Sequence, residues 1–227
     1  MIFQKPIFII MNKYKTILSM SRLTRFIVIF VIVTLTFSII RDKFARFVWE
    51  NFHLEKIALT FVQKDAELAD SIGNYYFNMS KEGTYNLPKA ERAYLKALAI
   101  DPSLPHTWHQ LARIDFLRGD FDKAIKKVNR QIELHGDSNM SSYYLRGLVY
   151  GYMKQFDKAE ADFLKFIEWK PPSWAARNDL AWVYFSKGDY KKSAEQALIG
   201  LEYEPANPWL LTSYGISLVN LGNIEEA

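Results

Sequence analysis

His106 and His109 are the side chains whose type and spacing come nearest to a recognisable site chemistry. They stand three residues apart, so on a helix they would share one face and could hold a metal ion together. Asp115 is the one carboxylate at helical spacing nearby, and two histidines alone are a weak metal signal. A solvated pair near the start of a helix is the simpler interpretation, so we expect no metal site.

Other catalytic signals are missing from the sequence of 227 residues. It has no cysteine, which excludes disulfides, thiol catalysis and cysteine-based metal sites. It has no glycine-rich phosphate loop and no nucleophile elbow, and its acidic residues pair only as helix-surface charges. We therefore expect no catalytic residue, no cofactor and a protein that is not an enzyme.

A regular repeat indicates which elements position the remaining side chains. A bulky apolar residue recurs in steps of 34, 35, 34 and 34 residues, and a small residue follows each one by three. The bulky column is Leu87, Phe121, Phe156, Tyr190 and Ile224, and the small column is Ala90, Ala124, Ala159, Ser193 and Ala227. A second small column is Gly73, Ala112, Gly147, Ala181 and Gly215, and a breaker recurs at Pro102, Gly136, Pro171 and Pro205.

Each repeat is predicted to be a pair of helices. Residues 106–118 place apolar side chains three and four apart, as expected for a helix with one buried face. Gly119 can then end this helix in a left-handed conformation, and Asp120 can cap the next one. The tripeptide Arg118-Gly119-Asp120, which looks like a cell-adhesion signal, is therefore interpreted as a turn. Lys187-Gly188-Asp189 occupies the equivalent place two repeats later.

These columns resemble those of the tetratricopeptide repeat family over residues 66–227. The matching positions are Trp108, Leu111, Ala112, Gly119, Asp120, Phe121, Ala124, Asp101-Pro102 and Glu204-Pro205. The resemblance implies an all-α, right-handed superhelical solenoid of antiparallel helix pairs. Asp115, Leu218 and Arg146 depart from the family pattern and put the local packing in doubt.

A solenoid of this kind lines a concave groove with the first helix of each pair. By helical phase, the predicted partner-binding residues are Asn74, Phe77, His109, Arg113, Tyr144, Tyr152, Asn178 and Trp182, with Phe116, Leu148, Phe185, Thr212 and Ile216 on the same faces. Aromatic and amide side chains suit an extended or helical peptide of a partner protein. In the competing interpretation, Trp182 and Phe185 simply pack between neighbouring repeats.

Some family members hold the C-terminal carboxylate of a chaperone tail with a Lys/Asn clamp. Asn74 could correspond to one clamp residue, but Asp70 is acidic where the clamp needs a cation. The resemblance therefore disfavours a chaperone-tail receptor.

Charge is unevenly distributed along the chain. Residues 1–65 hold ten Lys or Arg and four Asp or Glu, whereas residues 66–227 carry a net charge of −2. No basic stripe runs along the repeats, so we expect no nucleic-acid partner.

The basic front end surrounds an uncharged run that predicts a membrane anchor. Residues 26–40 contain no charge and lie between Arg25 and Arg41. A helix of this length spans only about 22 Å, and arginines that snorkel at both ends would extend its reach. A cleaved signal peptide is the alternative, but no cleavage motif follows. The excess of basic residues before the run favours repeats on the extracytoplasmic side.

The expected organisation has four parts. These are a basic segment 1–25, a transmembrane anchor 26–40, an amphipathic connector 41–65 and a solenoid 66–227, with repeats at about 66–104, 105–139, 140–173 and 174–207 and a partial one at 208–227. The connector is expected to lie on a membrane, to pack on the first repeat or to continue the anchor as a helical stalk. The expected function is a membrane-tethered, protein-binding scaffold. The alternative is the non-catalytic docking or regulatory region of a larger enzyme, a glycosyltransferase or protease, continuing past residue 227.

Overall fold

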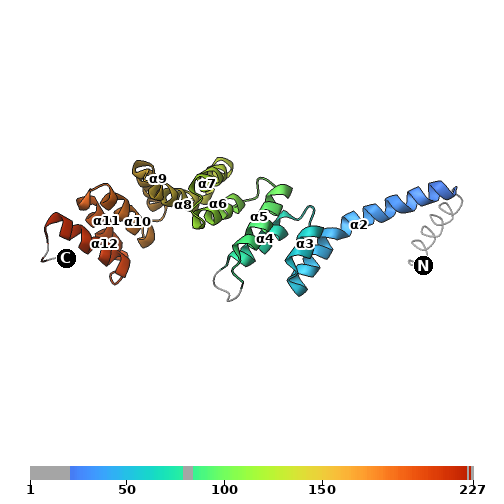
Figure 1. Cartoon of the computed structure of the whole chain (residues 1–227), viewed down its shortest axis with the longest axis horizontal. Coiled ribbons are helices and arrows are strands. Elements are labelled where there is room, and N and C mark those ends of the chain that lie inside the picture. The colour runs from blue at the N-terminus through green and yellow to red at the C-terminus, as the bar shows by residue number, and fades with distance from the viewer. Residues whose placement is uncertain (1–20, 79–83, 224, 226–227) are drawn as a thin grey trace, which may run out of the picture.

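The protein is an elongated stack of helices (Figure 1). The computed structural model describes residues 21–78, 84–223 and 225, and within these residues it contains helices and no strand. The helices are α2 (Arg22–Phe52), α3 (Glu55–Phe61), α4 (Ala66–Phe77), α5 (Leu87–Ile100), α6 (Thr107–Leu117), α7 (Phe121–His135), α8 (Ser141–Tyr152), α9 (Phe156–Trp169), α10 (Trp174–Ser186), α11 (Tyr190–Tyr203) and α12 (Pro208–Leu221), with a 3-10 turn at Gly136–Asn139. The prediction of an all-α solenoid is confirmed.

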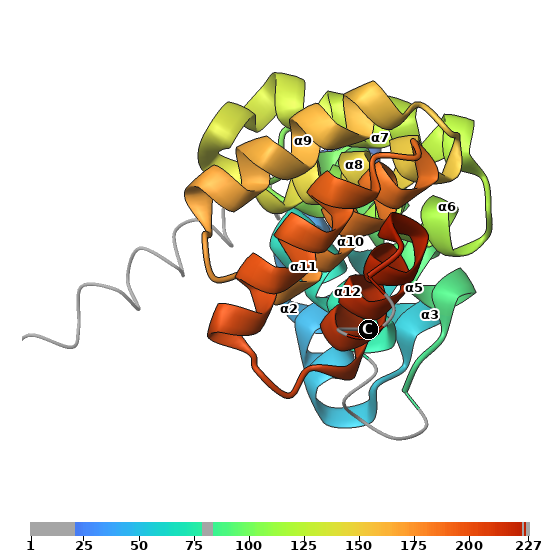
Figure 2. The same ribbon diagram turned by 90° about the vertical axis from the view of Figure 1, so that its left-hand side faces the viewer.

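Consecutive helices pair, and the pairs stack on one another. The pairs are α4 with α5, α6 with α7, α8 with α9, and α10 with α11, while α12 packs against α11 at the C-terminal end. Seen along the stack in Figure 2, α7 and α9 lie beyond α8 at the outer edge, and α12 faces the viewer. Among the first helices of the pairs, α6 contacts α8, α8 contacts α10, and α10 contacts α12, so these four helices can build one surface.

The small residues lie where the helices cross, as predicted. Ala112, Ala124 and Ala181 are fully buried. A Cβ atom on Gly147 would lie 3.0 Å from the ring of Phe163, which is itself completely buried. Larger side chains have no room at these positions, because interiors are packed nearly as densely as organic crystals. The spacing of small residues is thus a packing constraint.

The turn after α6 confirms that the Arg-Gly-Asp tripeptide is part of the scaffold. Gly119 has φ +79°, the left-handed conformation that costs glycine little. Arg118 forms an ion pair with Glu91 of α5 at 2.8 Å. The sequence suggested that Asp120 caps α7, but its carboxylate makes no capping hydrogen bond. It forms an ion pair with Lys123 at 2.8 Å instead.

The equivalent turn after α8 differs in one residue. Lys154 occupies the left-handed position with φ +58°, where Gly119 and Gly188 stand in the neighbouring turns. A side chain in this conformation costs about 1 kcal/mol relative to glycine.

Two departures from the repeat pattern are explained by charged partners. Asp115 is almost fully buried and forms an ion pair with Lys127 of α7 at 2.6 Å. Arg146 donates from Nε and Nη2 to the two carboxylate oxygens of Asp162, at 2.7 and 2.8 Å. The packing that the sequence left in doubt is therefore closed by ion pairs in place of apolar contacts.

The segment between residues 41 and 65 packs on the first repeat. Its first part continues α2 without a break, and Ala45, Val48 and Trp49 are buried in the same cluster as α4 and α5. The carboxylate of Asp42 accepts hydrogen bonds from two backbone N–H groups, those of Gln63 at 2.6 Å and Lys64 at 3.2 Å. The hairpin of α2 and α3 thus covers the N-terminal end of the stack.

Two further expectations concern residues 1–40, which include the first part of α2. No helix within the described residues is long and apolar enough to cross a membrane, so the predicted transmembrane anchor at 26–40 is not supported. The predicted basic segment 1–25 lies, as far as residue 20, outside the described residues.

Candidate functional site

The first helices of the repeats line two adjoining pockets, which together we call the groove. The first pocket lies between α6 and α8 and has a volume of about 450 Å³. Its lining is His109, Arg113, Phe116, Leu117, Ser141, Tyr144, Leu145 and Leu148. The second pocket lies between α8, α10 and α12 and has a volume of about 260 Å³. Its lining is Leu148, Tyr152, Asn178, Asp179, Trp182, Trp209, Thr212 and Ser213.

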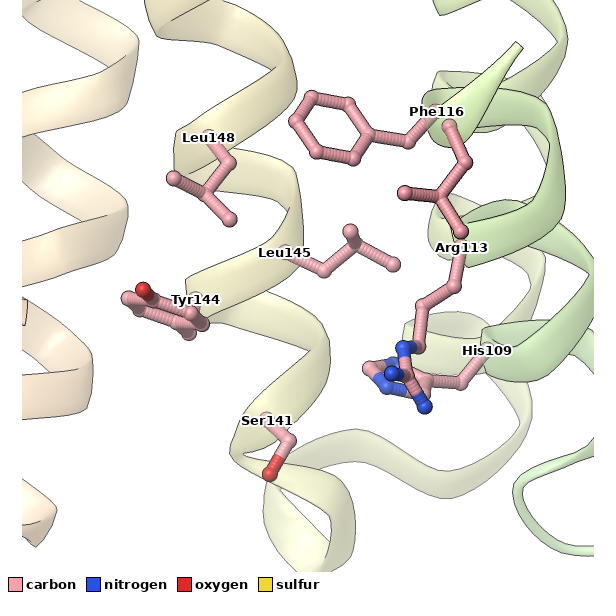
Figure 3. Close-up of a pocket in the computed structure, with 8 residues that line it drawn as sticks. His109, Arg113, Phe116, Ser141, Tyr144, Leu145 and Leu148 are labelled. Atoms are coloured by element: carbon pink, nitrogen blue, oxygen red, sulfur yellow. The ribbon is translucent and has the colours of Figure 1, made fainter. Parts of the chain in front are cut away.

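The first pocket has a polar end and an apolar end (Figure 3). The imidazole of His109 and the guanidinium of Arg113 lie side by side at one end, both from α6. Phe116 and Leu148 lie toward the other end, from α6 and α8 respectively, and Leu145 lies between the two ends. A ligand that fills this pocket would meet one charged group and several apolar ones.

His109 is held as a neutral side chain. Its Nδ1 lies 3.1 Å from the hydroxyl oxygen of Ser142, and its backbone N–H donates to Oε1 of Gln131 at 3.2 Å. Burial, and to a smaller extent the neighbouring charge of Arg113, lower the pKa of His109 to about 4. The pocket's positive charge at neutral pH therefore belongs to Arg113.

Arg113 is anchored by neutral groups. Its Nη1 donates to Oε1 of Gln110 at 2.9 Å, and its guanidinium carbon lies 4.5 Å from the centre of the Phe77 ring. Gln110 in turn donates to Oδ1 of Asn74 at 3.4 Å. Within the described residues no carboxylate forms an ion pair with Arg113, although its side chain is accessible to solvent. Partial desolvation lowers the pKa of the guanidinium, which nevertheless remains charged.

The second pocket is aromatic. The rings of Tyr152 and Trp182 lie 5.8 Å apart, and Trp209 exposes 65% of its surface beside them. Trp182 packs against Gly151, where a Cβ atom would come within 2.6 Å of its ring. Asn178 accepts a hydrogen bond from Ser213 at 2.9 Å, which fixes its amide. Flat apolar surface with a few polar groups is the usual composition of a peptide-binding surface.

A hydrogen bond and a shared leucine separate the two pockets. The hydroxyl of Tyr144 donates to Oδ2 of Asp179 at 2.5 Å, and Leu148 lines both pockets. Burial raises the pKa of Asp179, and the hydrogen bond from Tyr144 partly offsets this effect. The wall between the pockets therefore contains a desolvated carboxylate.

The structure brings most of the predicted groove residues together. His109, Arg113 and Tyr144 line the first pocket, and the predicted residues that line the second are Tyr152, Asn178 and Trp182. Asn74 stands behind Arg113 in the Gln110 hydrogen-bond chain. Whether these residues contact a partner stays a prediction.

Two predicted residues have structural contacts of their own. Phe77 is only 8% exposed and lies beneath Arg113, so its ring supports the groove and does not line it. Phe185 is half-buried with its ring 5.2 Å from Tyr190, so this contact lies within one repeat and not between neighbouring repeats as the packing interpretation suggested. Trp182 is 39% exposed and lines the second pocket, even though its ring also packs on the adjacent repeat.

Several residues that line the two pockets were not among the predicted groove residues. Trp209 and Ser141 stand one turn before Thr212 and Tyr144 on their helices, so the same helical phase extended by one turn would have included them. Asp179 gave no such signal, since its place depends on the contact with Tyr144.

The histidine pair does not form part of a larger cluster. His106 stands just before α6 with φ +69°, as its N-cap residue. Within the part of the chain that the structure describes, no three His, Cys, Asp or Glu side chains come together in a way that could hold a metal ion.

The chain is similar to known repeat proteins. A family model described as tetratricopeptide repeat matches residues 141–173, which comprise α8, α9 and the turns that follow them. BBSome complex member BBS4 of Bos taurus is 27% identical over 147 residues, 63% of this chain and 27% of that protein. Anaphase-promoting complex subunit CDC16 of Saccharomyces cerevisiae is 24% identical over 169 residues, 74% of this chain and 19% of that protein. The chain thus spans less than a third of the length of either relative.

The fold is shared with a solved structure. A crystal structure of MamA protein superposes with a TM-score of 0.61 and 22% identity, over 71% of this chain and 85% of that one. The helix pairs, the matched repeat and the similar proteins together support a tetratricopeptide-repeat solenoid.

Proposed function

We propose that the chain is a non-catalytic scaffold that binds a peptide or helix of a partner protein in the groove. The observation that carries this proposal is the adjacency of the two pockets, which share Leu148 and run across four successive first helices. Exposed aromatic side chains next to fixed amide and hydroxyl groups can bury a partner's side chains and also satisfy its backbone.

The similar proteins favour the same class of function. BBS4 is described as a member of the BBSome complex, and CDC16 as a subunit of the anaphase-promoting complex. Both therefore act inside assemblies of several proteins. For this chain, a role in holding protein partners is an inference from that similarity and from the groove.

Site-specific photo-crosslinking tests the proposal. A photoreactive phenylalanine derivative is placed at Tyr152 or Trp182, which expose 57% and 39% of their surface in the groove. The matched control is Lys191, an exposed position on α11 outside both pockets. The proposal requires that both groove positions capture the same partner segment and that Lys191 does not. Identical capture from all three positions, or capture from Lys191 alone, contradicts it.

We further propose that residues 26–40 associate with a membrane, with the repeats on the extracytoplasmic side. The support is the uncharged run in the sequence and the exposure of apolar side chains on α2. Phe26 is 67% exposed, Phe30 58% and Val33 57%. A flotation assay with vesicles tests the association, and protease protection in cells tests the side. Replacing Phe26, Phe30 and Val33 by serine should move the protein from the vesicle fraction to the free fraction, because each change removes apolar surface. An unchanged distribution contradicts the proposal.

A further inference from the structure

We propose that the first pocket binds an acidic side chain, Asp or Glu, of the partner peptide, next to an apolar residue of the same peptide. Arg113 provides the counter-charge, and the apolar end of the pocket receives the neighbouring side chain. The inference rests on the proposed function, since it specifies the chemistry of the peptide that the groove takes.

The first step concerns the charge of Arg113. Its guanidinium donates to Gln110 through Nη1, and no described carboxylate pairs with it. Lys127 and Arg146, which have little exposure, pair with the carboxylates of Asp115 and Asp162. The buried Arg177 donates to the Pro171 carbonyl and to Gln196, and it does not line the pocket, whereas Arg113 is exposed in it. A planar guanidinium presents five N–H donors, so Arg113 keeps donors available for a carboxylate.

The second step concerns the orientation of this group. A chain of hydrogen bonds leads from Asp70 through Asn74 to Gln110 and on to Arg113. The Phe77 ring supports the guanidinium from one side at 4.5 Å. Figure 3 shows the guanidinium beside the His109 ring at the polar end of the pocket. An arginine held in place in this way loses less side-chain entropy when it binds a carboxylate.

The third step concerns the rest of the pocket. Phe116, Leu117, Leu145 and Leu148 provide its apolar surface, and the whole pocket holds about 450 Å³. This volume is sufficient for a small ligand group, and most of its lining is apolar, as in binding sites where a few polar groups fix orientation. A lone carboxylate would leave the apolar part empty, so the pocket fits an acidic and an apolar side chain together.

The fourth step concerns alternatives to a peptide. The repeats carry a net charge of −2 over residues 66–227, so they supply no net positive charge that would hold a long polyanion such as a nucleic acid. The second pocket has a carboxylate, Asp179, and no cation. An acidic residue of the peptide is therefore favoured in the first pocket and disfavoured in the second, which would fix the register of the bound segment.

Phage-displayed random 12-residue peptides, selected on the full chain, provide the probe. Representative peptides are synthesised with an amidated C-terminus, so that only a side chain can supply a carboxylate. Each is made in the selected form and with its Asp or Glu replaced by Asn or Gln. Their dissociation constants are measured by fluorescence anisotropy against the unchanged protein, Arg113→Gln, Arg113→Lys and Arg130→Gln. Arg130 lies on α7 outside both pockets and pairs with Glu133, so Arg130→Gln is the control for the same change in net charge.

The expected result is a coupling between the acidic side chain of the peptide and Arg113. Replacing the peptide's acid by its amide should weaken binding to the unchanged protein about tenfold, the usual size of one charge-assisted hydrogen bond. The same replacement should change binding to Arg113→Gln less than about twofold, and Arg130→Gln should behave like the unchanged protein. Arg113→Lys keeps the charge but loses the fork, so an intermediate loss is expected, and it remains informative if Arg113→Gln unfolds.

Failures of the two proposals are distinguishable. The inference is overturned if the selected peptides are not enriched in Asp or Glu, if acid and amide forms bind alike, or if only a free C-terminus binds. The groove still stands in that case if Trp182→Ala weakens binding. If the selected peptides bind Trp182→Ala and Arg113→Gln as tightly as the unchanged protein, both proposals fail.

Discussion

The two pockets of the groove are built from equivalent positions of successive repeats, yet they have opposite chemistry. The first has a cation, Arg113, that pairs with no carboxylate among the residues that the structure describes, beside a neutral histidine. The second has a half-buried carboxylate, Asp179, among exposed tryptophans. Helix α8 forms a wall of both, so the backbone is common and only the side chains differ. Repeats with the same backbone geometry can therefore set the orientation of a bound ligand along the groove, because each repeat presents different side chains to it.

The largest effect should come from the contact between α9 and α8, the helix that both pockets share. Gly147 lies on α8, and a Cβ atom there would meet the fully buried Phe163 ring at 3.0 Å. Gly147→Leu should lower the free energy of unfolding by about 3 kcal/mol, because the leucine side chain extends beyond the Cβ position and must displace the buried ring. Urea unfolding measures this loss, and Lys191→Leu on the exposed face of α11 should change it by less than about 0.5 kcal/mol. Equal losses would mean that the seam is not tightly packed.

The second-largest effect should be a loss of folding stability in acid that comes from His109 in the first pocket. The pKa of His109 is lowered to about 4 by burial, whereas an unfolded histidine titrates near 6.5. Below about pH 6.5 this histidine is protonated in the unfolded chain but stays neutral in the folded chain. Acid therefore favours unfolding. Between pH 7 and pH 5 this group should cost about 2 kcal/mol of stability.

His109→Gln should remove most of that acid sensitivity. Urea unfolding at pH 7 and pH 5 measures the difference between the two pH values for each protein. His53→Gln is the control, because His53 is an exposed residue at the end of α2. A loss between the two pH values that is as large in His109→Gln as in the unchanged protein would contradict the interpretation of the first pocket.

A third test strengthens the shared helix without touching either pocket. Lys154 has φ +58° in the turn after α8, where the neighbouring turns have glycine. Lys154→Gly should raise the free energy of unfolding by about 1 kcal/mol, less the entropy that glycine adds to the unfolded chain. Peptide binding should not change. Thermal unfolding measures the gain, and a lower stability would show that the side chain of Lys154 makes contacts that outweigh the strain.

The smallest effect is expected in the wall between the pockets. Burial raises the pKa of Asp179 above 3.8, so the folded chain holds its proton to a higher pH than the unfolded chain does. Stability from this group is therefore present at low pH and is lost as the pH rises through the folded pKa. Asp179→Asn keeps an oxygen that can accept from Tyr144, and should leave stability at pH 7 unchanged or higher by up to about 1 kcal/mol.

Asp157→Asn provides a control of opposite sign. Asp157 is exposed, and its hydrogen bond from Lys187 lowers the pKa of its carboxyl, so its contribution is lost as the pH falls. A series of unfolding measurements between pH 4 and pH 7 compares the two variants. The same slope for both would remove Asp179 from the comparison between the pockets.

Much of the fold could be predicted from the columns of the sequence. Ala112 and Gly147 had to be small because backbones cross there, and Gly119 had to end a helix because its position needs a left-handed residue. These constraints are local or repeat at a fixed period, which makes them visible in one chain.

The groove was predictable as a surface, but its chemistry was not. The contact between Tyr144 and Asp179 joins residues 35 positions apart and depends on the rotamers of both. The burial of Phe77 under Arg113, and the absence of a carboxylate beside that arginine among the described residues, also appear only after the repeats are stacked. Residues 41–65 had three possible arrangements, and the structure combines two of them. Helix α2 continues as far as Phe52, and its buried residues pack in one cluster with residues of α4 and α5.

The unbroken course of α2 has a mechanical consequence. Its 31 residues extend about 46 Å, and the hydrogen bonds of Asp42 and the Arg46–Asp65 ion pair fasten its second half to the stack. The first half is part of the same continuous helix, so its direction relative to the stack is set by the second half. A surface or partner that binds the first half would therefore also set the direction in which the groove faces. Partners of the groove would then be selected by their angle of approach as well as by their sequence.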